Sequence, residues 1–351
     1  MMLSFQIPKP SDMHLHVRQG DMLQLVTPHT SKQFCQAVIM PNTSPPITNL
    51  ELLRNYRDEI LAAAPIDHDF KPLMTMYLSP QIELTDIREG KESGDLHAIK
   101  LYPFGVTTNS EHGAKSLKDV ASHLTLMEEL GVPLLIHGED SDPKTDVFDR
   151  EKIFYQETLQ GIIKDYPDLK ITCEHITTKV AADFIATASE NIGATITPQH
   201  LGCDRNDMLG NGINPHLYCK PILKRSEDRE ALLKLVFSGH PRVFAGTDSA
   251  PHTKDKKECD CGCAGVYSAS HAIEHYAKAF DDYGDLSKPE TQEIFGRFMS
   301  YNGPDFYELE APEDLIILQK KASDIPKNFT SEEGDTLIPW QAGEKTGWSV
   351  V

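Results

Sequence analysis

The residues best suited to chemistry in this sequence are His14 and His16, which are separated by one leucine. On a β-strand both side chains would project to the same face, because side chains alternate between the two faces. The two imidazoles would then lie about 7 Å apart, and could bind one cation where the strand ends. Arg18 has the same parity, and its positive charge suits an anionic substrate group rather than a metal. A lone His-x-His pattern is more often an ordinary exposed strand, so further ligands must be found.

Four other apolar segments that we expect to be strands carry a polar residue near their carboxyl ends. Lys100 lies inside an apolar run, and His137, His175 and Asp248 each terminate one. Taken singly, each residue is explained by a salt bridge, a side chain that reaches solvent, or a hydrogen-bonded rim position. A barrel would bring all of these strand ends into one ring. Five strand ends with a possible ligand make coincidence the weaker explanation.

Four histidines, one lysine and one aspartate suit a pair of zinc ions, because imidazole and carboxylate are both good zinc ligands. A buried lysine has a lowered pKa, and its neutral amine can react with carbon dioxide to give a carbamate that bridges two metals. Two adjacent metals can share a hydroxide near neutral pH. Asp248 would lie beside it as the proton shuttle.

The elements that must position these residues are short β-rich segments alternating with amphipathic ones. Alternation of this kind predicts right-handed βαβ units and a parallel sheet. Eight units favour a (β/α)8 barrel with its active site at the carboxyl ends of the strands. A doubly wound open sheet is the alternative, but no Gly-x-Gly-x-x-Gly fingerprint follows the first strand. The expected strands are 13–17, 37–41, 73–78, 98–102, 133–137, 170–175, 194–197 and 242–248, and the expected helices include 48–64, 116–130, 150–166, 178–189 and 227–238.

We therefore predict the α/β fold class, as a TIM-type (β/α)8 barrel with a C-terminal helical extension and tail. Residues 1–310 would form the barrel unit. A helix over 291–301 should be stopped by Asn302-Gly303-Pro304. Residues 311–351 are rich in charge and proline, and are expected to form an irregular tail packed on the barrel.

Composition excludes several classes of partner. Of the 351 residues, 39% are hydrophobic and 25% are charged, as in ordinary globular proteins. The net charge of −19 argues against nucleic acid, but a few local cations can still bind an acidic small molecule. No apolar run approaches the ~20 residues that span a bilayer, and residues 1–10 do not resemble a signal peptide. A cytoplasmic protein without a membrane partner is the expectation.

The seven cysteines are an odd number and do not resemble a secreted disulfide framework. Three of them form the cluster Cys259, Cys261 and Cys263. No second cysteine pair lies at zinc-finger spacing, so three reduced thiols are favoured over a metal cluster, which remains the alternative.

Seven runs together resemble the amidohydrolase superfamily and, within it, the class II dihydroorotases. The resemblance extends from about residue 10 to Tyr307, and CGCAG at 261–265 belongs to the same pattern. The main departure is Lys220, where the family pattern has an apolar residue; that contact is expected from backbone atoms. The seven runs are DMHLHVR at 12–18, IMPNT at 39–43, AIKLYP at 98–103, LIHGE at 135–139, CEHI at 173–176, KPILK at 220–224 and GTDSAPH at 246–252.

The resemblance implies reversible cyclisation of N-carbamoyl-L-aspartate to L-dihydroorotate in pyrimidine (UMP) biosynthesis, by a homodimer with two zinc ions per chain. Lys100 would be an N6-carboxylysine that bridges the ions, and Asp248 the catalytic acid–base group. The implied ligands are His14, His16, Lys100 and Asp248 for the more buried zinc, and Lys100, His137 and His175 for the other.

The resemblance also implies which residues contact the substrate. Arg18 would form a bidentate pair with the substrate α-carboxylate, which Asn42 and His252 would also hold. The loop after Lys100 carries Thr107 and Thr108 and would act as a lid. The full implied contact set is His16, Arg18, Asn42, His137, Lys220, His252 and Ala264.

Two other functions are compatible with parts of this pattern. A hydantoinase-like cyclic amidase would keep the metals, but would not need Arg18, Asn42 and His252 to converge on a carboxylate. A catalytically inactive barrel serving as a scaffold should have lost ligands, and all six are present. Bound zinc, and turnover of carbamoyl aspartate compared with a neutral hydantoin, would discriminate between a dihydroorotase, a cyclic amidase and an inactive scaffold.

Overall fold

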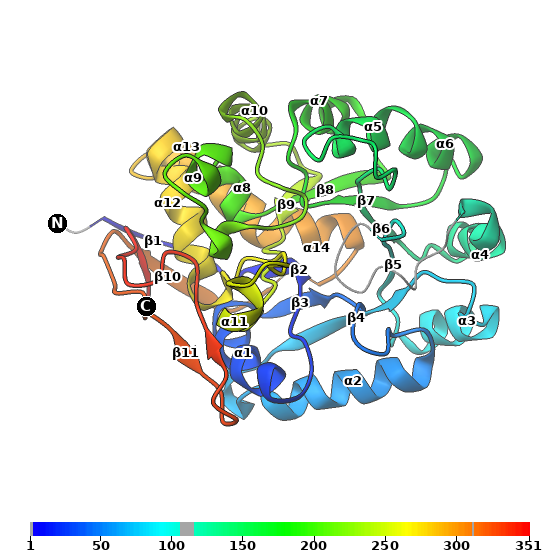
Figure 1. Ribbon diagram of the computed structural model, residues 1–351, viewed down its shortest axis with the longest axis horizontal. Helices are drawn as coiled ribbons and strands as arrows, with labels where there is room; N and C mark the ends of the chain where they lie inside the picture. Colours follow the sequence, from blue (N-terminus) through cyan, green and yellow to red (C-terminus); the bar gives the residue numbers. More distant parts are fainter. Residues whose placement is uncertain (1–2, 106–115, 311) are drawn as a thin grey trace.

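The computed structural model describes residues 3–105, 116–310 and 312–351, and is built around an eight-stranded parallel sheet (Figure 1). The last strand adjoins the first: the Asp248 amide donates to the His14 carbonyl at 2.9 Å, and the His16 amide to the Ser249 carbonyl at 3.1 Å. The predicted TIM-type barrel is therefore confirmed. Its strands, in spatial and chain order, are β2 (Ser11–Leu15), β3 (Gln36–Ile39), β4 (Lys71–Tyr77), β5 (Ala98–Leu101), β6 (Leu134–His137), β7 (Ile171–Glu174), β8 (Ile192–Ile196) and β9 (Val243–Ala245).

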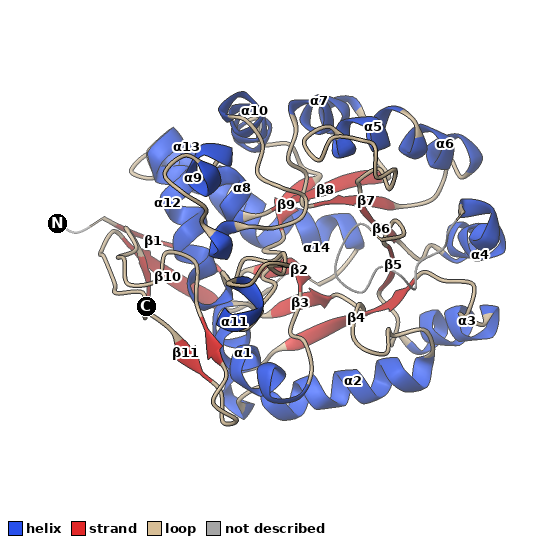
Figure 2. Cartoon of the chain, viewed as in Figure 1, coloured by secondary structure: helices blue, strands red, loops and turns tan. Residues whose placement is uncertain are grey.

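Helices surround the strands, as Figure 2 shows. Their ends follow local signals: the Asn49 side chain accepts from the Leu52 amide, and Gly131 at a φ of 64° ends α4. The expected helix over 150–166 is divided into two. Among the described residues, no helix combines the length and apolar character needed to cross a bilayer. The α-helices are α1 (Gly20–Gln33), α2 (Leu50–Ala63), α3 (Leu84–Ser93), α4 (Ala121–Leu130), α5 (Arg150–Gln156), α6 (Thr158–Asp165), α7 (Lys179–Thr187), α8 (Pro198–Gly202), α9 (Arg205–Leu209), α10 (Ser226–Phe237), α11 (Lys254–Lys257), α12 (Ala272–Gly284), α13 (Pro289–Gly296) and α14 (Asn302–Tyr307).

The barrel interior is apolar at its amino-terminal end. Met13, Leu135 and Phe244 point inward and are at most 1% exposed. Phe306 and Tyr307 of α14 pack against them, with ring centroids 5.5 Å and 5.7 Å from that of Phe244. The aromatic side chains of α14 therefore cover the apolar interior of the barrel at this end.

The prediction that Asn302-Gly303-Pro304 stops a helix is wrong. A π-helical turn at Arg297–Tyr301 leads directly into α14, which begins at Asn302. Pro304 lies in the first turn of α14, where a missing amide hydrogen is tolerated. Gly303 packs on Met13, which lies 2.7 Å from where a β-carbon would be. The glycine therefore permits a close approach of α14 to the barrel.

Phe244→Ala should destabilise the fold by about 3–5 kcal/mol, because it opens a cavity between the barrel and α14. Denaturant unfolding measures the change. Ile213→Ala is the matched control, since that side chain is 81% exposed and its truncation should change stability little. Equal stability of the two variants would contradict the role given to α14.

The C-terminal segment contains more regular structure than its composition predicts. Strand β10 (Leu315–Gln319) pairs antiparallel with β1 (Ser4–Pro8), and β13 (Ser349–Val350) extends this small sheet. A hairpin of β11 (Phe329–Thr330) and β12 (Thr336–Leu337) follows β10. Trp348 is 1% exposed and contacts the Phe5 ring at 5.7 Å.

Candidate active site

The structure brings the predicted ligands together at the carboxyl ends of the strands. The His175 ring lies 4.9 Å from the His14 ring and 4.7 Å from the His137 ring, between centroids. Lys100 on β5 and Asp248 after β9 are buried at the same end. Five strand ends thus converge on one polar cluster inside an otherwise apolar barrel.

One group within this cluster has the arrangement of a metal site. Ligand atoms of His14, His16 and Asp248 all lie within 4.8 Å of one another. Nε2 of His14 is 3.4 Å from Oδ1 of Asp248, and Nε2 of His16 is 3.1 Å from the same oxygen. All three side chains are buried, and burial lowers the pKa of both histidines. Neutral imidazoles facing a carboxylate can hold a metal ion.

Lys100 and His175 each have a buried nitrogen that the described residues around it do not satisfy. Lys100 is 0% exposed, and neither its Nζ nor the Nδ1 of His175 has a hydrogen-bond partner among the described residues. Burial lowers the pKa of Lys100 to about 8. Buried polar atoms without partners are unfavourable, and a bound cation and its ligands would satisfy them. The nitrogen and oxygen donors therefore fit a zinc-type centre.

Two carboxylates orient the histidines, and sequence reasoning gave neither a role. Oε2 of Glu174 lies 2.7 Å from Nδ1 of His14 and also accepts from the Thr195 hydroxyl. Oε2 of Glu139 lies 2.6 Å from Nε2 of His137. A carboxylate on one ring nitrogen fixes the tautomer and leaves the other nitrogen for a metal. The sequence feature that could have revealed these two residues is the presence of an acidic residue in or beside an apolar strand.

Asp12 is a third acidic residue whose role the sequence did not reveal. Its carboxylate accepts from the Thr247 amide at 2.8 Å, from the Thr247 hydroxyl at 2.6 Å and from the His14 amide at 3.1 Å. Burial nevertheless raises its pKa to about 7. Asp12, the second residue of β2, ties this strand to the segment after β9, and so helps to fix the spacing of His14 and Asp248.

The backbone is strained at three of the predicted site residues. The φ values are 60° at Arg18, 40° at His175 and 44° at Asp248, in the left-handed region that residues with a β-carbon rarely adopt. Such strain persists where surrounding contacts fix it, often at functional sites. Strand β2 ends at Leu15, so the alternation expected to orient Arg18 does not extend that far.

Arg18 still lies beside the other predicted carboxylate-binding residues. Its Nη2 is 3.1 Å from Nε2 of His252, and its Nε donates to the Pro251 carbonyl. Nε2 of His252 is also 3.0 Å from the Ala264 carbonyl. A neutral ring nitrogen cannot accept from the guanidinium and donate to the carbonyl at once, so only one of these contacts is a hydrogen bond at a time. The Asn42 side chain forms a hydrogen bond with the His16 side chain.

These groups line an open pocket of about 600 Å³ whose wall includes His16, Arg18, Asn42 and His252. A small cavity beside it adds Lys220, Asp248 and Ala264 to the same surroundings. Arg18 and His16 line both cavities, so the Arg18 guanidinium lies close to the candidate metal ligands His16 and Asp248. The predicted lid residues Thr107 and Thr108 lie outside the described residues.

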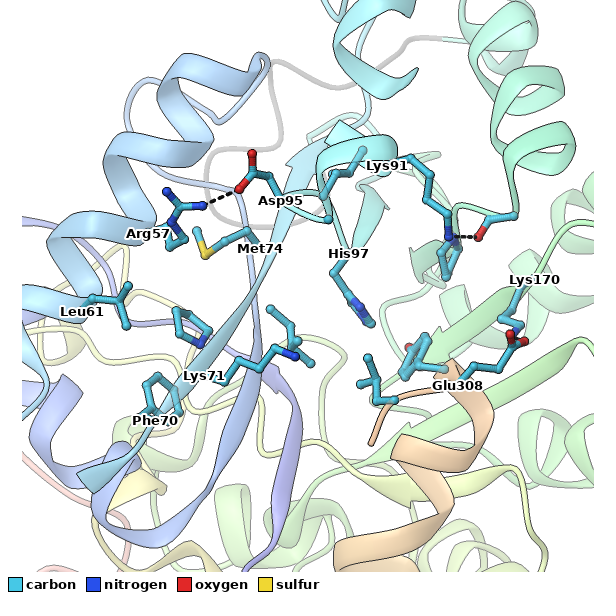
Figure 3. A pocket seen from close by; sticks show the side chains of 18 of the residues that line it. Arg57, Leu61, Phe70, Lys71, Met74, Lys91, Asp95, His97, Lys170 and Glu308 are labelled. Carbon is cyan, nitrogen blue, oxygen red and sulfur yellow. Dashed lines mark hydrogen bonds and ion pairs between the residues drawn. The ribbon is translucent and has the colours of Figure 1, made fainter. Parts of the chain in front are cut away.

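A larger pocket of about 730 Å³ lies at the opposite end of the barrel (Figure 3). It is lined by residues at the amino-terminal ends of the strands, such as Lys71, His97 and Lys170, and Arg57 there pairs with Asp95. None of the described predicted site residues lines it. Its size therefore does not mark the place of the chemistry.

Comparison with known proteins agrees with this geometry. A sequence profile described as "Amidohydrolase family" matches residues 7–312. The chain is 46% identical over 346 residues to a dihydroorotase of Erwinia tasmaniensis, covering 98% of this chain and 97% of that protein. It superimposes on a Saccharomyces cerevisiae dihydroorotase, crystallised with 5-fluoroorotic acid, at a TM-score of 0.90 and 34% identity. The match covers 99% of this chain and 98% of that one.

An L-hydantoinase (dihydropyrimidinase) of Arthrobacter aurescens is more distant. It matches at a TM-score of 0.79 with 15% identity, over 99% of this chain and 83% of that one, which shows a shared fold only. The family profile, the high identity to dihydroorotases over their whole length, and the convergence of the histidines, lysine and aspartate all point to one family. This chain belongs to the dihydroorotase family of amidohydrolases.

Proposed function

We propose that this chain catalyses the reversible cyclisation of N-carbamoyl-L-aspartate to L-dihydroorotate in pyrimidine biosynthesis. The observation that carries the proposal is that Arg18 and His16 line both the pocket that contains His252 and the adjoining cavity that contains Asp248. An anionic substrate can then be held by its carboxylate while its amide reaches the metal-type group. Identity to whole dihydroorotases supports this substrate.

We propose two zinc ions per chain as the cofactor. The Nζ of Lys100 has no hydrogen-bond partner in the part of the chain that the structure describes, which supports its conversion to N6-carboxylysine, since an unmodified ammonium would repel two cations. Bound zinc would supply Lewis acidity and lower the pKa of water. The proposed ligands are His14, His16, Lys100 and Asp248 for one ion, and Lys100, His137 and His175 for the other.

Asp248 is the proposed proton carrier. In the hydrolytic direction water attacks the ring amide carbonyl, the C–N bond breaks, and Asp248 passes a proton from the water to the departing nitrogen. Cyclisation is the reverse sequence. Asp248 suits this task because it is buried beside both histidines, and burial raises its pKa.

Arg18→Lys should weaken binding of carbamoyl aspartate roughly ten- to a hundredfold while leaving the metal content unchanged. The reason is that a single ammonium cannot reproduce the bidentate guanidinium–carboxylate pair. KM and zinc per chain are the measurements. A variant with the parental KM would remove Arg18 from the substrate site.

The deciding experiment is turnover by the purified holoprotein with carbamoyl aspartate, dihydroorotate and a neutral hydantoin, alongside zinc per chain by elemental analysis. We expect metal-dependent interconversion of the first two and little reaction with the hydantoin. Preference for the hydantoin would instead establish a cyclic amidase of another specificity. Bound metal without turnover of any of the three would favour a scaffold. Sedimentation analysis tests the proposed homodimer.

A further inference from the structure

Lys257, the last residue of α11, is a buried lysine in a segment of exposed ones. Its side chain is 3% exposed, whereas Lys254 and Lys256 on the same short helix are exposed. Its Nζ donates to three backbone carbonyls: Tyr218 at 2.9 Å, Cys263 at 2.8 Å and Gly265 at 2.6 Å. An ammonium has three donors, so these acceptors satisfy it completely.

The three carbonyls belong to two segments that are far apart in sequence. One segment contains Tyr218 and leads into Lys220, and the other is 263–265. The Gly265 amide also donates to the Tyr218 carbonyl at 2.9 Å. Lys257 therefore joins two walls of the small cavity that contains Lys220 and Ala264. Neither wall is held by a regular strand pairing at this point.

Ala264 lies between two of the carbonyls that Lys257 binds. Its own carbonyl is 3.0 Å from Nε2 of His252, and that nitrogen is 3.1 Å from the Arg18 guanidinium. Gly265 has a φ of 153°, and a β-carbon there would lie 2.3 Å from the Ala250 carbonyl oxygen. This segment thus runs close against the strand-end loop that carries His252, and a shift of it would move the His252 contact.

Among the residues that the structure describes, Lys257 has no carboxylate in an ion pair with it, and a buried ammonium without such a partner is unfavourable. The groups near Lys257 include the thiols of Cys219 and Cys263 and the cation Arg18, and burial lowers the pKa of Lys257 to about 8. An apolar side chain could fill the same space, but it would take this donor from the Cys263 and Gly265 carbonyls and leave the Tyr218 carbonyl with the Gly265 amide. The ammonium is best explained by what its three hydrogen bonds hold in place.

We propose that Lys257 is a positioning residue for substrate binding, which fixes the 263–265 segment and the Tyr218–Lys220 segment so that Ala264 and His252 meet the substrate carboxylate. It contacts neither the reacting atoms nor the proposed metal ligands. This inference rests on the proposed function, and assigns one more residue to the same site.

The test compares Lys257→Met, Lys257→Gln and the parental holoenzyme with carbamoyl aspartate as substrate. Methionine keeps the length of the side chain and removes every donor, whereas glutamine keeps two. We expect KM to rise roughly ten- to a hundredfold in K257M, and less in K257Q, with kcat changing little and zinc per chain unchanged. Lys254→Met is the matched control: its exposed pair with Glu258 spans 3.8 Å and its loss should leave KM unchanged.

Parental KM in K257M would overturn the proposal, as would a loss of zinc or an equal fall of kcat and kcat/KM. If K257M does not fold, K257Q is judged by the same criteria. A crystal structure of the variant gives a readout that needs no activity: the 263–265 backbone should shift while His14, His16 and Asp248 stay in place. An inactive parental enzyme would reject the proposed function, whereas an unmoved segment would reject only the role of Lys257.

Discussion

Lys100→Ala should lose both turnover and bound zinc. The side chain is fully buried at the end of β5, and its Nζ has no hydrogen-bond partner among the described residues. If the lysine carbamate bridges two zinc ions, its removal takes one ligand from each. The fall in kcat/KM should exceed the roughly 10–100-fold loss typical of residues that only support a metal ligand. Zinc per chain and kcat/KM are measured on the same preparation.

Rescue separates a missing bridge from a collapsed barrel. A short carboxylic acid can enter the space left by the side chain and supply two oxygens, so acetate or propionate should restore part of both metal content and activity. Lys234→Ala is the control, because that lysine is exposed and pairs with Glu230 one helical turn away on the surface. Active, metal-loaded protein with a bare amine at position 100 would refute the carbamate directly.

The barrel could be predicted because each strand is a short apolar run that ends at polar or turn-forming residues. In a parallel sheet covered on both faces the strands read as continuous apolar runs, as β6 does before His137. The pairing of β1 with β10 could not be predicted in this way. Ser4 pairs with Gln319, and no local pattern links positions so far apart in the chain. The course of α14 was missed for a similar reason, since Gly303 is explained only by its contact with Met13.

The convergence of the candidate ligands could be predicted because histidine, lysine and aspartate are chemically conspicuous at the ends of apolar strands. The residues that support them are not. Glu174 and Asp12 act through hydrogen bonds to His14 and Thr247 that exist only after the barrel closes. Lys257 was missed for the same reason: nothing in its local sequence distinguishes it from Lys254. Its partners come from carbonyls that the fold brings together.

Asp248→Asn should lower kcat by roughly 10²–10⁴-fold while much of the zinc stays bound. Asparagine keeps the shape of the side chain and one oxygen that can bind a metal, but its amide cannot accept and return a proton. In the structure Oδ1 of Asp248 lies 3.4 Å from Nε2 of His14 and 3.1 Å from Nε2 of His16, and this one carboxylate is proposed to have both a metal-binding and a proton-carrying role. The asparagine variant separates the two roles.

A second substitution completes the separation. Asp248→Ala removes the ligating oxygen too, so it should lose zinc as well as turnover, whereas the exposed Asp282→Asn should lose neither. If Asp248 carries the proton, D248N will be nearly as inactive as D248A at a much higher zinc content. If Asp248 is only a ligand, activity in both variants will follow zinc content alone. Normal turnover by metal-loaded D248N would mean that another residue moves the proton.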